Sequence, residues 1–356
     1  MATSGPKKEV ATAHIVGVDS LRLICAVWVL LSHAGGVPIV SLLKAAQAPA
    51  QVQTAMRALN GIAFNGVAAV VVFFVISGFC IHFPARGKQS VDPIPFWARR
   101  MLRVGLPLIV ATLLARIVSG HSGSLDPVLW SLYCELIYYG LYPLLIRTAS
   151  RIGWIPLFSG SPVAALALAG MKDSDNGFLW TYGVTLTWLL GLPIWIGGIL
   201  IAEKCDLWLI PPSKIQLYSV RVAVWAYSAL AVALQFHSRV HYKLTMLLFC
   251  PLAMAWFIFE IRNSNKKGAY QVLEIGGRAS YSLYLCHLIA LDAVAELFGR
   301  TNMVLLPYIS QLFLALGMSA SFYLLVERPA HSLARLVSRR IQVIAAVSQD
   351  LRTHKR

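Results

Sequence analysis

Charged side chains are scarce in this chain of 356 residues. Asp, Glu, Lys and Arg together make up 13% of the sequence, whereas 58% of the residues are hydrophobic. Soluble globular domains carry about 25% charged residues, so the shortage excludes an ordinary soluble protein. The hydrophobic residues form runs long enough to cross a bilayer. We therefore predict an all-α fold, a polytopic bundle of transmembrane helices.

Signatures of several common enzyme and metal sites are missing. The six cysteines show no CxxC or other metal-ligand spacing, and almost all lie in or beside apolar runs. This pattern is typical of small buried side chains, so we expect neither a disulfide framework nor a metal site. The sequence also contains no P-loop, no GxSxG serine elbow and no HExxH motif. It therefore offers no phosphate-binding loop, hydrolase nucleophile or zinc-protease helix.

Acidic residues are half as frequent as basic ones, with 15 Asp and Glu against 31 Lys and Arg, and the formal net charge is +16. A nucleic-acid partner is one reading of such a balance. However, the basic residues are spread between the apolar runs instead of being gathered on one segment. That distribution favours contact with anionic lipid headgroups, so we expect the bilayer and not a nucleic acid as the partner.

Ten apolar runs predict about ten spans. They cover residues 19–43, 62–83, 104–120, 128–146, 153–171, 179–202, 217–236, 243–260, 280–299 and 304–326. With the N-terminus inside, most lysines and arginines fall on inner segments, which predicts that both termini are cytoplasmic. The fifth run is interrupted by Pro156, Gly160 and Pro162. If the fifth run does not cross the membrane, every later run crosses it in the opposite direction.

The predicted domain organisation is simple. Residues 1–16 form a polar cytoplasmic tail, residues 17–327 form the membrane domain, and residues 328–356 form a basic tail. Apolar residues recur at helical spacing in the basic tail, which predicts an amphipathic helix along the inner membrane surface. The first run could instead be a cleaved signal peptide, because Lys7 and Lys8 precede it and small residues follow it. Cleavage there would remove a helix with an unusual polar pair.

That pair is Arg22 and His33. The two residues are eleven positions apart, so on a helix they share one face and lie about 16 Å apart along the axis. Ionisable groups at membrane depth are costly and by default face a bundle interior or a cavity. A short list of other ionisable residues is expected at such a depth, namely His82, Arg116, Glu135, His287 and Asp292.

Glu135 lies well inside the run LWSLYCELIYYGLYPLL, among tyrosines that can donate hydrogen bonds. A carboxylate at this depth needs a partner, and Arg22 or His33 is a candidate. In such a group, a neutral imidazole can take the proton of a hydroxyl that attacks an acyl carbonyl. An arginine can hold a phosphate or the developing oxyanion, and a carboxylate can orient the imidazole or hold the acceptor.

Six motifs occur in the order found in one family. They are LRLICAVWVLLSH, which carries an Arg-x10-His signature, then FFVISGFCI, FWARRMLRVGLP, LWSLYCELIYYGLYPL, SYSLYLCH and VERPA. With these motifs the chain resembles the acyltransferase-3 family of membrane O-acyltransferases from about residue 18 to 329. Many relatives have Arg-Ile-Tyr-Pro in the basic segment. Here the stretch from Arg103 to Pro107 is one residue longer.

The resemblance implies transfer of an acyl group, usually acetyl, from cytoplasmic acyl-coenzyme A (acyl-CoA) to a hydroxyl of a carbohydrate or glycolipid. Typical acceptors are lipopolysaccharide, exopolysaccharide or another secreted glycan, modified at the bacterial inner membrane. The resemblance makes His33 the principal catalytic residue and Arg22 its companion, with Glu135 as a third candidate. It leaves open whether His33 acts as a base or carries the acyl group transiently.

The remaining site residues follow from the same motifs. The phosphates of coenzyme A would dock at the cytoplasmic face on Arg99, Arg100 and Arg103. Ser77 and Gly78 belong to the SGF turn near this cofactor site, where small residues allow close helix approach. The residues expected to contact the acceptor or support the site are Trp130, Ser131, Tyr138, Tyr139, Tyr284 and His287.

Two other functions remain possible from the sequence. A secondary transporter or glycan flippase would use the intramembrane Arg, His and Glu residues as a proton relay, although the sequence shows no convincing internal repeat. A transmembrane scaffold or sensor would use them for structure alone. Release of coenzyme A from acetyl-CoA distinguishes the transferase from both.

Overall fold

The computed structural model describes residues 15–119, 125–171, 182–183, 185–205, 210–238, 240–299 and 305–353. Most of the predicted 1–16 tail lies outside these ranges. Every regular element within them is a helix, which confirms the predicted all-α class. The helices are α1 (Val18–His33), α2 (Ile39–Ala45), α3 (Ala50–Ala63), α4 (Gly66–His82), α5 (Pro93–Arg100), α6 (Leu106–Ser119), α7 (Asp126–Ile152), α8 (Trp154–Met171), α9 (Thr187–Lys204), α10 (Lys214–His237), α11 (Tyr242–Lys267), α12 (Gln271–Arg278), α13 (Ser280–Phe298), α14 (Leu305–Phe322) and α15 (Arg328–Thr353).

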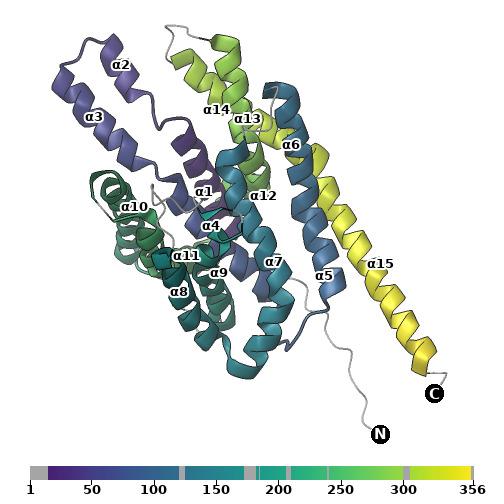
Figure 1. Cartoon of the computed structure of the whole chain (residues 1–356). Helices are drawn as coiled ribbons and strands as arrows, with labels where there is room; N and C mark the ends of the chain where they lie inside the picture. The colour runs from purple at the N-terminus through teal and green to yellow at the C-terminus, as the bar shows by residue number, and fades with distance from the viewer. Residues whose placement is uncertain are drawn as a thin grey trace.

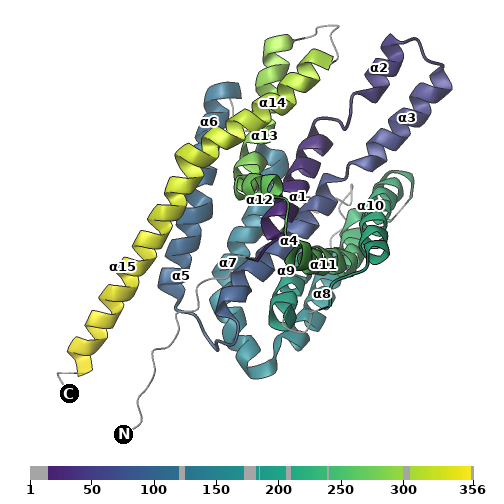
Figure 2. The same ribbon diagram turned by 180° about the vertical axis from the view of Figure 1, so that it is seen from behind.

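Helices α1 and α4 lie in the middle of the bundle. Helices α8 to α11 gather on one flank, and α5, α6 and α15 lie on the other (Figures 1 and 2). Helix α4 contacts α1, α9 and α11, and α1 also contacts α12 and α13. Gly78 of α4 lies so close to the backbone of Trp195 in α9 that a Cβ atom would overlap it. This confirms the close helix approach expected at the SGF turn.

The first helix is shorter than the apolar run predicts. It ends at His33, although the run continues to Leu43. Gly35 and Gly36 have φ angles of 77° and 78°, a region that favours glycine. The Asn60 side chain holds this turn by donating to the Gly35 carbonyl at 2.8 Å and accepting from Val37 N at 3.0 Å. His33 therefore lies on the last turn of α1.

Eight helical segments of the described chain are long and apolar enough to cross a membrane. They include seven of the later predicted runs and the second run, 62–83. The first run forms the 16-residue helix α1, and the fifth forms the proline-containing helix α8. The chain is therefore a polytopic helix bundle, whereas the count of ten spans and the cytoplasmic termini stay predictions.

The basic tail forms α15, which continues from α14 through a π-helical segment, Tyr323–Glu327. Its buried residues include Ala330, Ala334 and Ser338, and Ser338 Oγ donates to the carbonyl of Pro95 in α5 at 3.1 Å. Larger apolar residues of the same helix, such as Leu333 and Leu336, are exposed. Helix α15 thus packs on α5 through small side chains and leaves a second apolar face uncovered.

Candidate active site

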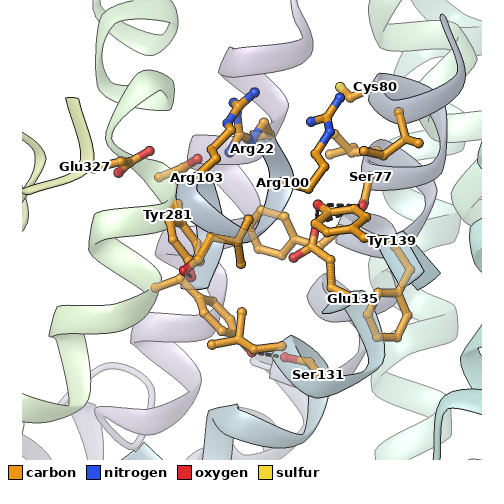
Figure 3. Close-up of a pocket in the computed structure, with 18 of the residues that line it drawn as sticks. Arg22, Ser77, Cys80, Arg100, Arg103, Ser131, Glu135, Tyr139, Tyr281 and Glu327 are labelled. Carbon is orange, nitrogen blue, oxygen red and sulfur yellow. Dashed lines mark hydrogen bonds between the residues drawn. The ribbon is translucent and has the colours of Figure 1, made fainter. Parts of the chain in front are cut away.

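A cavity of about 270 Å³ lies between α1, α4, α5, α7 and α13, and it extends to the start of α15. We call it the basic cavity, because its described lining carries four arginines and two glutamates. Figure 3 shows Arg22, Arg100 and Arg103 gathered on one side of this cavity and Ser131 on the opposite side. The polar residues that line it are Arg22, Ser77, Arg99, Arg100, Arg103, Ser131, Glu135, Tyr139, Ser280, Tyr281, Tyr284, Glu327 and His331.

Two of the four arginines of the basic cavity, Arg100 and Arg103, contact aromatic rings or a neutral imidazole. The guanidinium of Arg100 lies 5.7 Å from the Phe96 ring centroid and 5.8 Å from that of Tyr139. Its Nε atom is buried without a hydrogen-bond partner among the described residues. Arg103 Nε donates to His331 Nε2 at 3.2 Å. Because these guanidinium N–H groups of Arg100 and Arg103 are not hydrogen-bonded to carboxylates of the described residues, they can bind an anion.

Local structure explains why Arg99, Arg100 and Arg103 face the same space. Asp92 caps α5 by accepting from Ile94 N, and the two adjacent arginines occupy the last turn of that helix. Arg103 follows in a π-helical segment, Met101–Gly105. A π-turn holds one residue more than an α-turn, and such segments are frequent at functional sites. The stretch from Arg103 to Pro107, which the resemblance leads us to expect to be one residue longer than in many relatives, therefore begins at a π-helical turn.

Glu135 has a different partner from the one considered from the sequence. Its carboxylate accepts from Ser77 Oγ at 2.8 Å and from the hydroxyl of Tyr139. Ser77 Oγ also accepts from Trp195 Nε1 at 3.2 Å. The carboxylate thus ties α4 to α7 in the wall of the basic cavity. Arg22 instead has Asp19 as its ion-pair partner, at 3.4 Å.

His33 opens onto a second cavity, of about 640 Å³. We call it the aromatic cavity, because rings from α3–α4, α7, α10 and α11 line it together with a few polar groups. His33 itself is exposed toward this space. The described residues of its lining that carry rings or polar side chains are Ser32, His33, Phe64, Asn65, Asp126, Trp130, Phe236, Tyr242 and Tyr284.

The partner of His33 is His287. His33 Nδ1 lies 3.0 Å from His287 Nε2, and the two rings stack with centroids 5.1 Å apart. His287 is fully buried in α13, and its Nδ1 lies 2.9 Å from the carbonyl oxygen of Tyr284 and 3.1 Å from that of Leu283. The structure therefore brings together two histidines that are 254 positions apart in the chain.

The two cavities meet at Tyr284 and Val70, which line both of them. The Tyr284 hydroxyl is hydrogen-bonded to Ser131 Oγ at 2.7 Å, and its ring lies edge-on to Phe73 with centroids 5.9 Å apart. The same ring lies 6.0 Å from that of His287. Tyr284 and Ser131 thus form a partition between the guanidinium groups and the histidine pair.

Three predicted site residues are not part of either cavity lining, and one of them, His287, contacts the aromatic cavity through His33. Gly78 faces α9, as described above. Tyr138 is fully buried, donates to the carbonyl of Trp188 at 2.8 Å and packs against Phe74 and Trp195. Trp130 lines the aromatic cavity, whereas Ser131 and Tyr139 line the basic one.

Sequence reasoning missed two ionisable residues of the basic cavity. Glu327 is buried and accepts from the backbone N of Ser282 at 3.1 Å and from its Oγ at 2.5 Å. His331 lies 3.6 Å from Glu327 and is hydrogen-bonded to Arg103. Glu327 lies within the VERPA motif, and His331 is one helical turn further on, so the spacing of four could have identified the pair.

Comparisons with known proteins cover nearly the whole chain. A family profile described as "Acyltransferase domain" matches residues 15–326. The chain is 24% identical to nodulation protein 10 of Rhizobium leguminosarum bv. viciae, over 95% of this chain and 100% of the relative. It is 27% identical to the exopolysaccharide production protein ExoZ of Rhizobium meliloti (strain 1021), over 65% of this chain and 78% of the relative. No solved structure matches the chain.

Proposed function

Because the chain belongs to the acyltransferase-domain family, we propose that it moves an acyl group, in the simplest case acetyl, from cytoplasmic acyl-CoA to a hydroxyl group of a carbohydrate acceptor. The names of its relatives, a nodulation protein and an exopolysaccharide production protein, support an acceptor of the secreted glycan or glycolipid type. The proposed location is the inner membrane of a bacterium, with both termini cytoplasmic. The single observation that carries the proposal is the meeting of a basic and an aromatic cavity beside His33.

The basic cavity suits the donor. Coenzyme A carries phosphate groups, and guanidinium groups bind phosphate through pairs of N–H donors. Arg99 and Arg100 face the cavity from the last turn of α5 and Arg103 from the π-helical segment that follows, and Arg335 and Arg339 of α15 add positive charge near Arg99. Arg22 lies on the same side of the cavity as Arg100 and Arg103 (Figure 3). In our proposal these arginines hold the phosphates, and the acyl thioester points toward Tyr284.

The aromatic cavity suits the acceptor. Flat apolar ring faces pack on sugar rings, and carboxylates accept hydrogen bonds from hydroxyl groups. Trp130, Phe236 and Tyr242 supply the rings, and the exposed Asp126 supplies the carboxylate. Pockets of this kind, apolar with a few placed polar groups, are the usual form of small-molecule sites. We assign the acceptor hydroxyl to the space beside His33.

The reaction then proceeds by general base catalysis. The imidazole of His33 takes the proton of the acceptor hydroxyl while the hydroxyl oxygen attacks the thioester carbonyl. Collapse of the tetrahedral intermediate breaks the C–S bond, and the leaving thiolate takes the proton back from the imidazolium. The products are the acyl ester and free coenzyme A. Arg22 supports the reaction from the donor side, and Glu135 holds Ser77 and Tyr139 in the cavity wall.

A labelling experiment tests this function. Membrane vesicles that contain the protein and the host glycan are supplied with [14C]acetyl-CoA, and label in the glycan fraction is measured. We expect wild-type vesicles to label the glycan and His33→Ala vesicles to give background label. The matched control is His237→Ala, which removes an exposed histidine outside both linings and should leave labelling unchanged. Equal labelling by His33→Ala and wild type would exclude the proposed role of His33.

The adjoining cavities also fit a transport pathway, with the basic cavity on one side of Tyr284 and the aromatic cavity on the other. A secondary transporter or flippase therefore stays the second candidate. Purified protein in nanodiscs with acetyl-CoA and a glycan extract separates the two, because a transferase releases coenzyme A in step with glycan acetylation. A transporter releases none.

A further inference from the structure

The contact between His33 and His287 determines where each ring proton lies. His287 Nδ1 approaches two backbone carbonyl oxygens, at 2.9 and 3.1 Å. A carbonyl oxygen only accepts hydrogen bonds, so His287 Nδ1 carries a hydrogen and donates it. The His287 side chain is fully buried, and a charged imidazolium would be costly to desolvate there. Its ring is therefore neutral, and its Nε2 holds a lone pair.

The position of the ring hydrogen on His33 follows from that on His287. Because His287 Nε2 has a lone pair, the 3.0 Å contact requires His33 Nδ1 to be the donor. A neutral His33 then has no hydrogen on Nε2. His33 lines the aromatic cavity and is exposed toward it. The unprotonated Nε2 is thus the nitrogen available to a hydroxyl group in that cavity.

From this chain of hydrogen bonds we propose that His287 is a positioning residue, which holds His33 in the tautomer whose Nε2 is the catalytic base. The proposal rests on the acyltransferase function proposed above. When His33 takes the acceptor proton on Nε2, its Nδ1–H becomes a charged donor to His287 Nε2, and such hydrogen bonds are stronger than neutral ones. The proton then passes from His33 Nε2 to the leaving thiolate, and His287 keeps its own proton throughout.

This role replaces one that the sequence offered to Glu135. A carboxylate can orient an imidazole, but Glu135 is bonded to Ser77 and Tyr139 in the wall of the basic cavity. A buried backbone-anchored histidine supplies the same acceptor without placing a negative charge in the apolar bundle. The orientation of the His287 ring is fixed by its own helix, because the two carbonyl oxygens that accept from Nδ1 lie one turn earlier in α13.

A purely structural role of His287 must be separated from positioning, since its ring also packs on His33 at 5.1 Å. His287→Gln places an amide oxygen near the former Nε2 and keeps an acceptor for His33 Nδ1–H. His287→Leu has similar bulk and no acceptor. We expect His287→Leu to lower the maximal rate of glycan labelling about 100-fold or more, within the range for general base catalysis. His287→Gln should restore it to within about tenfold of wild type, and the KM for acetyl-CoA should be unchanged in both.

Similar losses in the leucine and glutamine variants, with both proteins present in the membrane, would overturn the proposal. A spectroscopic test is independent of activity. In protein labelled with [15N]histidine, solid-state NMR distinguishes protonated from bare ring nitrogens, and His33 is assigned by its loss in His33→Ala. We expect a bare Nε2 in wild type and His287→Gln and a mixture of tautomers in His287→Leu. A protonated Nε2 in neutral wild-type His33 would overturn the proposal, whereas absent acyl transfer with the expected spectrum would contradict only the function.

Discussion

The basic and aromatic cavities differ in how their polar groups are secured. In the basic cavity, Arg100 lies on two rings, Arg103 donates to His331, and the Nε of Arg100 has no partner among the described residues. In the aromatic cavity, His33 is bound to a buried second histidine. The first arrangement leaves charge available for a ligand, whereas the second fixes the orientation of one ring. Under the proposed function, the arginine side of Tyr284 binds the donor and the His33 side carries out the chemistry.

The strongest test of this division is His33→Gln. We expect acyl transfer to fall about 1,000-fold, because the general base is lost. Binding of acetyl-CoA should be unchanged, since His33 is not part of the basic cavity. Isothermal titration of purified protein with acetyl-CoA measures the binding, and glycan labelling measures the transfer. A large loss of acetyl-CoA affinity in this variant would contradict the separation of donor binding in the basic cavity from catalysis at His33.

The converse test is Arg100→Ala. Hydrogen bonds to charged groups contribute about 1.5 to 3 kcal/mol, so the Kd for acetyl-CoA should rise about 10- to 100-fold. Transfer at saturating acetyl-CoA should change far less. The matched control is Arg147→Ala, an exposed arginine outside both linings, which should leave the Kd unchanged. Unaltered affinity in Arg100→Ala would contradict the assignment of the donor site to the basic cavity.

The partition itself is tested by Tyr284→Phe, which removes the hydroxyl that is bonded to Ser131. Loosening this contact should let water reach the thioester, so hydrolysis of acetyl-CoA without acceptor should rise several-fold, on the scale of one lost hydrogen bond of about 1 kcal/mol. Ser131→Ala removes the other half of the same bond and should act alike. Coenzyme A release in the absence of glycan is the measurement. Wild-type hydrolysis in both variants would show that the partition is not the barrier to water.

The smallest effect is expected from Glu135→Gln. The amide oxygen can still accept hydrogen bonds from Ser77 and Tyr139, and a negative charge is removed from an anion site. We expect transfer to stay within about fivefold of wild type, the span of roughly 1 kcal/mol, with equal or tighter binding of acetyl-CoA. A loss of acyl transfer as large as that of His33→Gln would indicate that Glu135 takes part directly in catalysis.

Much of the candidate site follows from local sequence. Helical periodicity alone places Arg22 and His33 on one face of α1, because that spacing depends only on the backbone of one helix. The apolar runs likewise establish a membrane bundle, since their length and composition match the bilayer. The end of α1 at His33 was harder to predict, because it depends on Asn60 of α3 as well as on Gly35 and Gly36.

What the sequence by itself determined is therefore the class of fold, the ionisable residues at membrane depth and the pairing of Arg22 with His33 on one helix. Only the tertiary structure decided that His287 of α13, and not Glu135 of α7, is the partner of His33. It also decided that two cavities meet at Tyr284. The physical reason is the sequence distance over which each interaction acts. The position of a side chain around its own helix depends on a few neighbouring residues, whereas hydrogen bonds between helices depend on how the whole bundle packs.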